Sequence, residues 1–189
     1  MKLGSITTRC LVVVVVLIAL APAVASAQLL SKIANVNLSA ALAATLTVSV
    51  TSGSTVNFTL VNGSPADGDV PAVISTSWNV NPGLTGDVSL YGYFDTPAQA
   101  LTDGGGNDIP TSLVMGRMTT GTPATYTAFT QTNPVGPAGG GLALFSEAIT
   151  GLNKTKTRSD NLDLRIDLTG QALPPSTYTG IVRIQARAL

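Results

Sequence analysis

The stretch Asp160–Leu189, DNLDLRIDLTGQALPPSTYTGIVRIQARAL, carries the clearest structural signal in the sequence. Apolar and polar residues alternate in two runs, one centred on Leu164 and the other on Val182. Because successive side chains of a strand point to opposite faces, each run predicts a half-buried strand. Pro174 and Pro175 lie between the runs, and proline cannot donate to a ladder. We therefore expect a terminal β-hairpin with its apolar face on a core.

The composition favours strands over helices along the whole chain. Thr, Ser, Gly, Ala and Val dominate, and Glu147 is the only glutamate. Thr and Val fit pleated sheets, and the recurring Gly and Pro residues are typical of turns between short strands. The sequence predicts an all-β fold, a two-sheet antiparallel immunoglobulin-like sandwich of about 8–10 strands.

The individual strands can be placed from their alternation. The runs around Gly53 are close enough to predict a hairpin. Leu142–Thr150 is either a strand or a short helix, and the segment from Thr96 to about Ser112 is expected to be irregular. The other expected strands, in chain order, are Thr45–Val50, Thr55–Val61, Ala72–Val80, Asp87–Asp95, Leu113–Met118 and Tyr126–Phe129.

The first 27 residues have the organisation of a secretory signal peptide. Lys2 and Arg9 precede the apolar run Leu11–Leu20, and Ala25-Ser26-Ala27 is a small-residue cleavage site. The apolar run is short for a bilayer span, which needs about 20 residues. We expect secretion with cleavage after Ala27, which leaves one domain over 28–189 and an extracellular or cell-surface location.

The segment 28–44 allows two interpretations. Leu29, Leu30 and Ile33 fall at helical spacing, but alternation from Asn35 onward favours a strand. The apolar positions of that strand are Val36, Leu38, Ala40 and Leu42.

Several classes of enzyme and partner are excluded by missing residues. The chain has no histidine, and its one cysteine, Cys10, lies in the leader. Ser–His–Asp and Cys–His catalysis, histidine-bound zinc and a disulfide in the exported form are therefore impossible. Without the leader, eight basic residues face ten acidic ones, so no basic excess attracts nucleic acid. We expect a protein that is not an enzyme, with no membrane span in the mature chain.

Two binding sites remain as alternatives. Asp103, Asn107 and Asp108 surround a run of glycines and offer oxygen ligands for calcium, the one cofactor to be considered. The loop lacks the spacing of an EF-hand, and the same residues are typical of a turn. Tyr91 and Tyr93 share one face of a strand and would suit carbohydrate if that face were exposed.

The chain resembles secreted bacterial pilin-like and spore-coat-like surface subunits. The similarity lies in the early apolar strand NVNLSAALAATLTVSV and in the closing PPSTYTGIVRIQARAL, with Ser176–Gly180 as the most specific part. Many such subunits carry a disulfide, which this chain cannot form. The resemblance implies an immunoglobulin-like sandwich and, in the pilin case, self-association through an N-terminal strand lent to a neighbour. The lent residues would be Val36, Leu38, Ala40 and Leu42, although the same strand can also pair within its own domain.

The sequence thus predicts a non-catalytic structural or assembly protein of the cell surface. The alternative is a small extracellular module that binds calcium or carbohydrate.

Overall fold

The computed structural model describes residues 36–41, 43–80 and 86–189. The predicted leader Met1–Ala27 lies outside these residues, as do Asn35 and Leu42. Ala41–Leu189 forms one compact unit and Met1–Ala40 a second, and the description below concerns the first unit unless stated otherwise.

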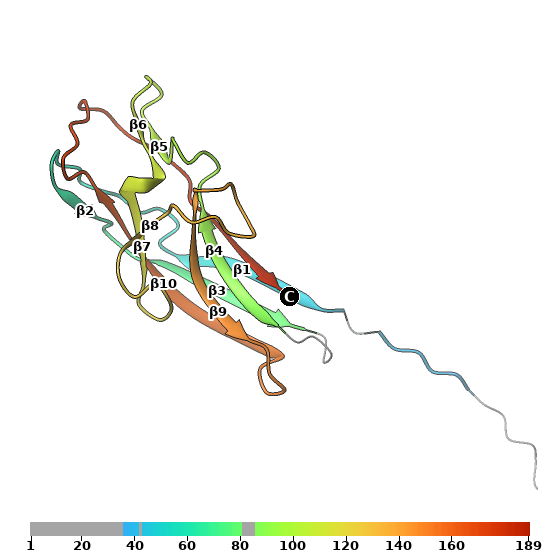
Figure 1. The fold of residues 1–189 in the computed structure, drawn as a ribbon. Helices are drawn as coiled ribbons and strands as arrows, with labels where there is room; N and C mark the ends of the chain where they lie inside the picture. Colours follow the sequence, from blue (N-terminus) through green and yellow to red (C-terminus); the bar gives the residue numbers. More distant parts are fainter. Residues whose placement is uncertain (1–35, 42, 81–85) are drawn as a thin grey trace, which may run out of the picture. The chain divides into compact units, whose positions relative to one another are not determined.

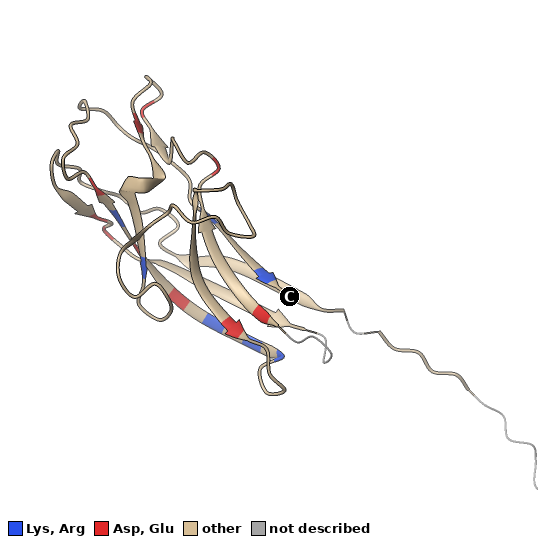
Figure 2. Ribbon diagram, viewed as in Figure 1, with Lys and Arg blue, Asp and Glu red and all other residues tan. Residues whose placement is uncertain are grey.

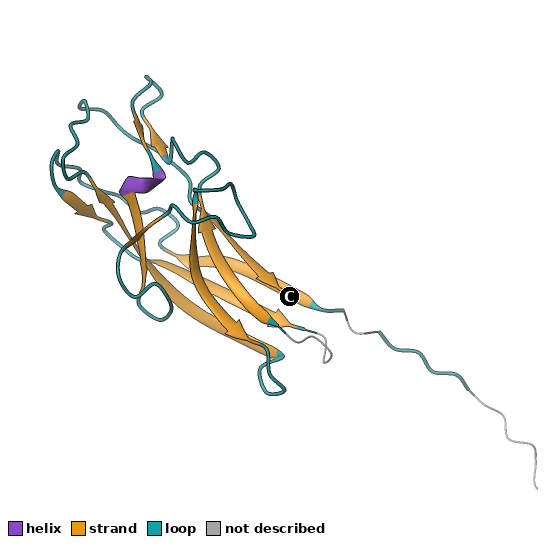
Figure 3. Cartoon of the chain, in the orientation of Figure 1, coloured by secondary structure: helices purple, strands orange, loops and turns teal. Residues whose placement is uncertain are grey.

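The compact unit is built almost entirely from antiparallel strands, as predicted (Figure 1). One 3-10 turn, η1 (Thr111–Leu113), interrupts them, and no α-helix occurs among the described residues (Figure 3). None of the described helical structure is long and apolar enough to cross a membrane. The strands are β1 (Thr45–Ser52), β2 (Pro65–Asp67), β3 (Ala72–Asn79), β4 (Asp87–Tyr93), β5 (Leu101–Thr102), β6 (Asp108–Ile109), β7 (Val114–Met118), β8 (Thr127–Ala128), β9 (Gly141–Ala148), β10 (Thr155–Asp167) and β11 (Arg183–Ala188).

The strands form two larger sheets and one small one. The first has the order β1-β3-β10-β7-β8, with β2 paired to β10, and the second has the order β11-β4-β9. The small sheet consists of β5 and β6, in a segment that the sequence analysis expected to be irregular. The Leu142–Thr150 run is a strand, β9, as one of its two interpretations predicted.

One hydrophobic core collects the apolar faces of both larger sheets. Ile74, Trp78 and Leu162 come from the first sheet, while Leu90 and Leu144 come from the second, and none is more than 1% exposed. Burial alternates residue by residue along β3 and along the second half of β10, as the period of a strand requires. The inward assignment of Leu162, Leu164, Ile166 and Leu168 is therefore correct.

The predicted terminal hairpin is wrong. β10 pairs with β2, β3 and β7, whereas β11 pairs with β4 in the other sheet. The connection between them includes Pro174 and Pro175 and is far longer than the two to five residues of a hairpin loop. Alternation identifies the buried face of a strand but not the strand it pairs with. The inward faces of both runs were therefore predicted correctly, whereas their pairing with each other was not.

The predicted hairpin around Gly53 is also wrong. β1 pairs with β3, and Thr55–Val61 contains no strand, only an isolated bridge from Phe58 to Gly68. Gly53 adopts a φ of 65° and its Cα lies so close to Pro71 that a Cβ would stand 2.1 Å from the Pro71 carbonyl oxygen. The chain therefore leaves β1 past Pro71 instead of folding back along it. Residues 36–41, which the sequence analysis favoured as a strand, have no regular structure.

Candidate functional site

Two strands with open edges lie side by side in the compact unit. β1 pairs only with β3, and β11 pairs only with β4, yet β1 and β11 are neighbours. Figure 1 shows that β11 ends where β1 begins, so the two run in opposite directions. No ladder joins them among the described residues. Each strand therefore has one edge whose backbone groups are not used by a sheet.

The open edge of β11 can be assigned residue by residue. The Leu189 N–H donates to the Asp87 carbonyl, and Thr179 exchanges two backbone hydrogen bonds with Thr102. In an antiparallel pair alternate residues bond to the partner, so the odd-numbered residues of this segment face β4 and β5. The backbone groups of Val182, Ile184 and Ala186 consequently point to the open side.

The open backbone groups of β1 can be assigned in the same way. The Val80 N–H donates to the Lys154 carbonyl, which places the even-numbered residues of β3 against β10 and the odd-numbered ones against β1. Thr45, Thr47 and Ser49, which lie opposite odd-numbered residues of β3, are therefore bonded to it. Leu46 and Val48 present their backbone groups to the open edge.

A groove of about 660 Å³ opens between the continuations of these two strands. One wall is the segment 53–60 after β1, and the other is the segment 176–184 that leads into β11. Its floor consists of core residues, namely Ala72, Val114, Leu162, Leu164 and Ile166 of the first sheet and Phe94, which directly follows β4. No residue that lines the groove carries a charge. The floor residues are themselves at most 7% exposed, so a ligand in the groove would meet mainly its uncharged walls.

The first wall is held in place by an acidic side chain. The Asp69 carboxylate accepts hydrogen bonds from the Asn57 backbone N–H and from Asn57 Nδ2, both at 2.9 Å. These bonds, the side-chain bond first, lower the pKa of Asp69. Val56, Phe58 and Leu60 turn toward the core and are only partly buried. The segment Thr55–Val61, which was expected to be a strand, therefore runs along the groove. It forms no ladder with another strand on its groove side.

The second wall is the Ser176–Gly180 motif that carried the resemblance, continued to Ile184. Tyr178 Oη donates to the Pro174 carbonyl oxygen at 3.0 Å, and burial of the phenol raises the pKa of Tyr178. Thr179 bridges to Thr102 of β5. Gly180 fits tightly here, because a Cβ would lie 2.0 Å from the Ala100 carbonyl oxygen. Contacts with the β5 region therefore fix this wall on its outer side and leave its inner side open.

The expected assembly strand is exposed and uncharged where the structure describes it. Val36 is 81% exposed and Leu38 is 92% exposed, which is unusual for large apolar side chains. Ala40 is exposed as well, and Leu42 lies outside the described residues. No charged residue occurs between Asn35 and Ala44.

The glycine-rich loop at Asp103 has a local structural role. Asp103 Oδ1 accepts from the backbone N–H groups of Gly105 and Asn107, and Oδ2 accepts from Asn107 Nδ2 at 2.7 Å. These bonds, with the Asn107 side chain first, lower the pKa of Asp103. Asp108 Oδ2 accepts from Gln99 Nε2 at 2.9 Å. The described residues contain no group of three His, Cys, Asp or Glu side chains able to hold a metal ion. The calcium site stays a prediction, and the contacts are those of a turn.

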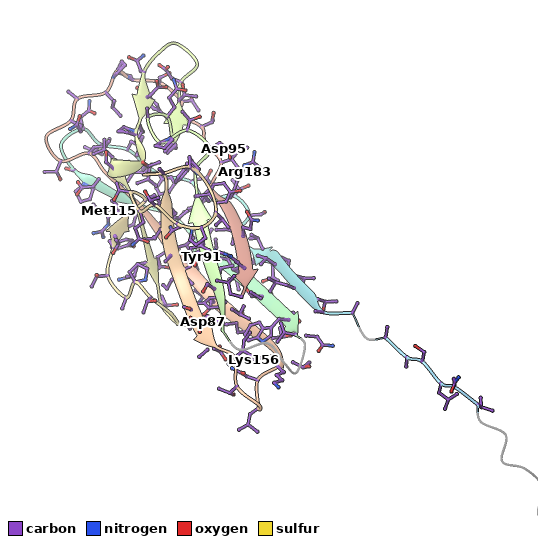
Figure 4. All side chains as sticks on the ribbon, turned by 45° about the vertical axis from the view of Figure 1, so that its right-hand side comes forward. Asp87, Tyr91, Asp95, Met115, Lys156 and Arg183 are labelled. Atoms are coloured by element: carbon purple, nitrogen blue, oxygen red, sulfur yellow. The ribbon has the colours of Figure 1, made fainter. Side chains whose placement is uncertain are left out.

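The tyrosine face is now assigned. Leu90 and Phe94 are buried in the core, so Tyr91 and Tyr93 lie on the outer face of the second sheet. Figure 4 labels Tyr91 on β4. Tyr93 is only half-buried, packs against Gly136 and approaches Gln185 at 3.3 Å. The neighbouring Arg183 forms an ion pair with Asp95 at 2.7 Å. The loop at Gly136 therefore covers part of the Tyr93 ring.

Comparison with protein-family models, curated proteins and solved structures found no match to this chain.

Proposed function

We propose that the protein is a secreted, non-catalytic structural subunit of the cell surface, pilin-like in its assembly. In this proposal the two larger sheets form an immunoglobulin-like sandwich that lacks one strand, and the gap lies between the segments 53–60 and 176–184. The missing strand is supplied by residues 35–42 of a second copy. The observation that carries the proposal is the uncharged groove of about 660 Å³, floored by Leu162, Leu164 and Ile166.

The groove and the segment suit each other both in their backbone hydrogen-bonding groups and in their apolar side chains. Backbone groups of Val182 and Ile184, which line the groove, are open to pair with an added strand, as in recognition by strand addition. Side chains at every second position of the segment would fall on one face, so Val36, Leu38, Ala40 and Leu42 can all point to the floor. Insertion would remove large exposed apolar side chains from water, at about 25 cal/mol per Å².

Insertion within the same chain is less favourable than insertion into a second copy. Only Ala43 and Ala44 separate Leu42 from β1. Folding back along β1 would therefore need a two-residue hairpin loop, which requires positive φ and prefers Asn-Gly, Asp-Gly or Gly-Gly. Two alanines oppose such a turn, because a Cβ disfavours positive φ.

A single charge placed on the segment tests the proposal. Leu38→Asp leaves the compact unit unchanged, because Leu38 is 92% exposed, but it would place an unpaired carboxylate on an apolar floor. We expect light scattering to show concentration-dependent assemblies for the wild type and monomers for Leu38→Asp, with equal melting temperatures of the monomeric domain.

The matched control is Asn37→Asp, which adds the same charge at a position that would face away from the floor. It should assemble as the wild type does. Assembly of Leu38→Asp at wild-type concentration, or a wild type that stays monomeric at all concentrations, would overturn the proposal.

A further inference from the structure

The two walls of the groove are linked to each other by one side chain. Asn62 follows the first wall, 53–60, and Leu173 precedes the second wall, 176–184. Asn62 Nδ2 donates to the Leu173 carbonyl oxygen, and the Leu173 N–H donates to Asn62 Oδ1, both at 2.9 Å. These bonds join positions 111 residues apart in the sequence, so they connect the two walls directly.

The link has the hydrogen-bond pattern of a β-ladder. In an antiparallel pair, a residue exchanges both its N–H and its C=O bond with one partner residue. Here the side-chain amide of Asn62 replaces the peptide groups of such a partner and satisfies both backbone groups of Leu173. An added strand cannot pair with Leu173 unless it displaces Asn62. The part of the second wall that is open to a strand therefore begins after Leu173.

The turn that carries Asn62 is attached to the first sheet. The Ser64 N–H donates to the Val61 carbonyl oxygen at 3.1 Å, and Gly63 has the positive φ, 77°, that a type II turn requires at its third residue. The Gly63 N–H donates to the Leu168 carbonyl oxygen at 3.1 Å. Leu168 directly follows β10 and is 1% exposed. The core therefore determines the position of Asn62.

The other side of the link is fixed as well. The Leu173 side chain packs against the hydrophobic core. The carbonyl oxygen of the next residue, Pro174, accepts the hydrogen bond of Tyr178, and Tyr178 lines the groove. Because both partners are held in place, the Asn62–Leu173 bonds set the distance between the walls at this position.

The groove exists while this link is formed. β1 and β11, which are neighbours, contribute Val50 and Ile184 to it and restrain the walls at a second position. The walls therefore cannot separate or approach freely. A binding site that is already held in its binding geometry loses less conformational entropy when its ligand binds. The link should for this reason strengthen the binding of a strand.

Burial does not explain why Asn62 forms these bonds. Its side chain is exposed, and its amide could bond to water instead. An exchange of water for a protein partner changes the free energy of folding little. Asn62 itself does not line the groove. Loss of its amide should therefore affect the geometry of the groove more than the stability of the domain.

We propose that Asn62 is a positioning residue, which holds the two walls of the groove at the separation that an inserted strand needs. This inference rests on the proposed function and adds to it the residue that prepares the groove. The affinity for a strand then depends on a side chain that the strand does not touch.

A peptide with the sequence of residues 35–44, labelled with a fluorophore, measures this affinity. The acceptor is the full chain with Leu38→Asp, which the proposed function expects to be monomeric. Fluorescence anisotropy gives the Kd of the peptide. Asn62→Ala in this acceptor should raise the Kd about tenfold and change the melting temperature little. Asn62→Asp is a second variant of the same shape, whose carboxylate oxygen cannot donate to the Leu173 carbonyl, and it should also raise the Kd.

The matched controls are Asn161→Ala and Asn161→Asp. Asn161 lies between the buried Asp160 and Leu162, so its side chain is on the outer face of β10. Both control variants should bind the peptide as the unsubstituted acceptor does. A peptide that carries Leu38→Asp should bind to none of these proteins.

The outcomes separate this inference from the proposed function. Failure of the peptide to bind the Leu38→Asp acceptor would remove both. Binding with equal Kd values for the Asn62 and Asn161 variants, or tighter binding by Asn62→Ala, would overturn the role of Asn62 and leave the proposed function standing. If Asn62→Ala does not fold, Asn62→Asp decides, and an unchanged Kd for it would overturn the inference.

Discussion

Arg158 and Asp160 stand two residues apart on β10 and form a two-pronged ion pair inside the domain. Arg158 Nε lies 2.6 Å from Asp160 Oδ2, and its Nη2 lies 2.5 Å from Oδ1. The Asp160 side chain is completely buried, and Thr120 Oγ1 donates to it at 2.9 Å. Arg158 also reaches Glu147 on β9, so one guanidinium connects strands of the two larger sheets. The pair therefore ties the two larger sheets together in the first half of β10.

Replacing Asp160 by Asn should be strongly destabilising. Arg158, whose side chain is 20% exposed, would keep its ion pair with Glu147 but lose the one with the buried Asp160, and breaking a buried pair costs up to about 3–5 kcal/mol. Urea unfolding would measure the loss. Asp163→Asn is the matched control, because its ion pair with Arg117 is partly exposed and is expected to contribute about 0–1 kcal/mol. Equal losses for the two variants would show that burial of the pair does not set its value.

Stability should fall in acid partly through Glu147. Burial of its carboxyl raises the pKa, but hydrogen bonds from Lys156, Asn153 and Arg158 outweigh burial and hold it below the ordinary value of 4.5. A carboxyl with a depressed folded-state pKa contributes stability above its unfolded pKa and loses it as the pH falls through the folded pKa. At pH 6 the free energy of unfolding should therefore be larger for the wild type than for Glu147→Gln. Below pH 4 this difference should shrink. A constant difference at both pH values would contradict this assignment.

The sequence predicted the class of fold and most strand positions because alternation reports directly on burial. β3, β4, β7 and the inward residues of β10 follow the expected pattern. The sequence did not predict which strands pair with each other, because pairing depends on the path of the connection that follows each strand. The chain after Asp167 crosses to the other sheet, and the chain after Ser52 turns away at Gly53.

Those two errors hid the groove. Each predicted hairpin assigned a partner to a segment whose inner edge has none in the described structure, namely 55–60 and 176–182. The paired prolines and the absence of a short Gly-containing loop before Tyr178 were the signals against the second hairpin. The assembly strand with Val36, Leu38 and Ala40 stays a prediction; the structure shows that these three residues are exposed.

Gly180→Ala should damage the second wall of the groove. The added Cβ would lie 2.0 Å from the Ala100 carbonyl oxygen, a backbone atom that cannot move aside alone. We expect a lower melting temperature, with amide exchange faster at Thr102 and Thr179, whose backbone pair depends on this approach. Gly151→Ala is the control, because its Cβ would meet nothing within 4 Å. Unchanged exchange at Thr102 would show that the wall is not fixed by this contact.

Two aspartate substitutions should separate folding from assembly. Leu164 is 7% exposed in the core, so Leu164→Asp should unfold the domain by burying an unpaired charge. Val182 is only partly buried on the wall of the groove, so Val182→Asp should cost less stability and instead block insertion of a strand. Arg183→Ala, which removes an exposed ion pair with Asp95, should leave both properties nearly unchanged. Figure 2 shows acidic and basic positions close together along β10, away from β11. Thermal melting and light scattering on the same samples would decide. A Val182→Asp protein that is folded and still assembles would show that this wall does not receive a strand.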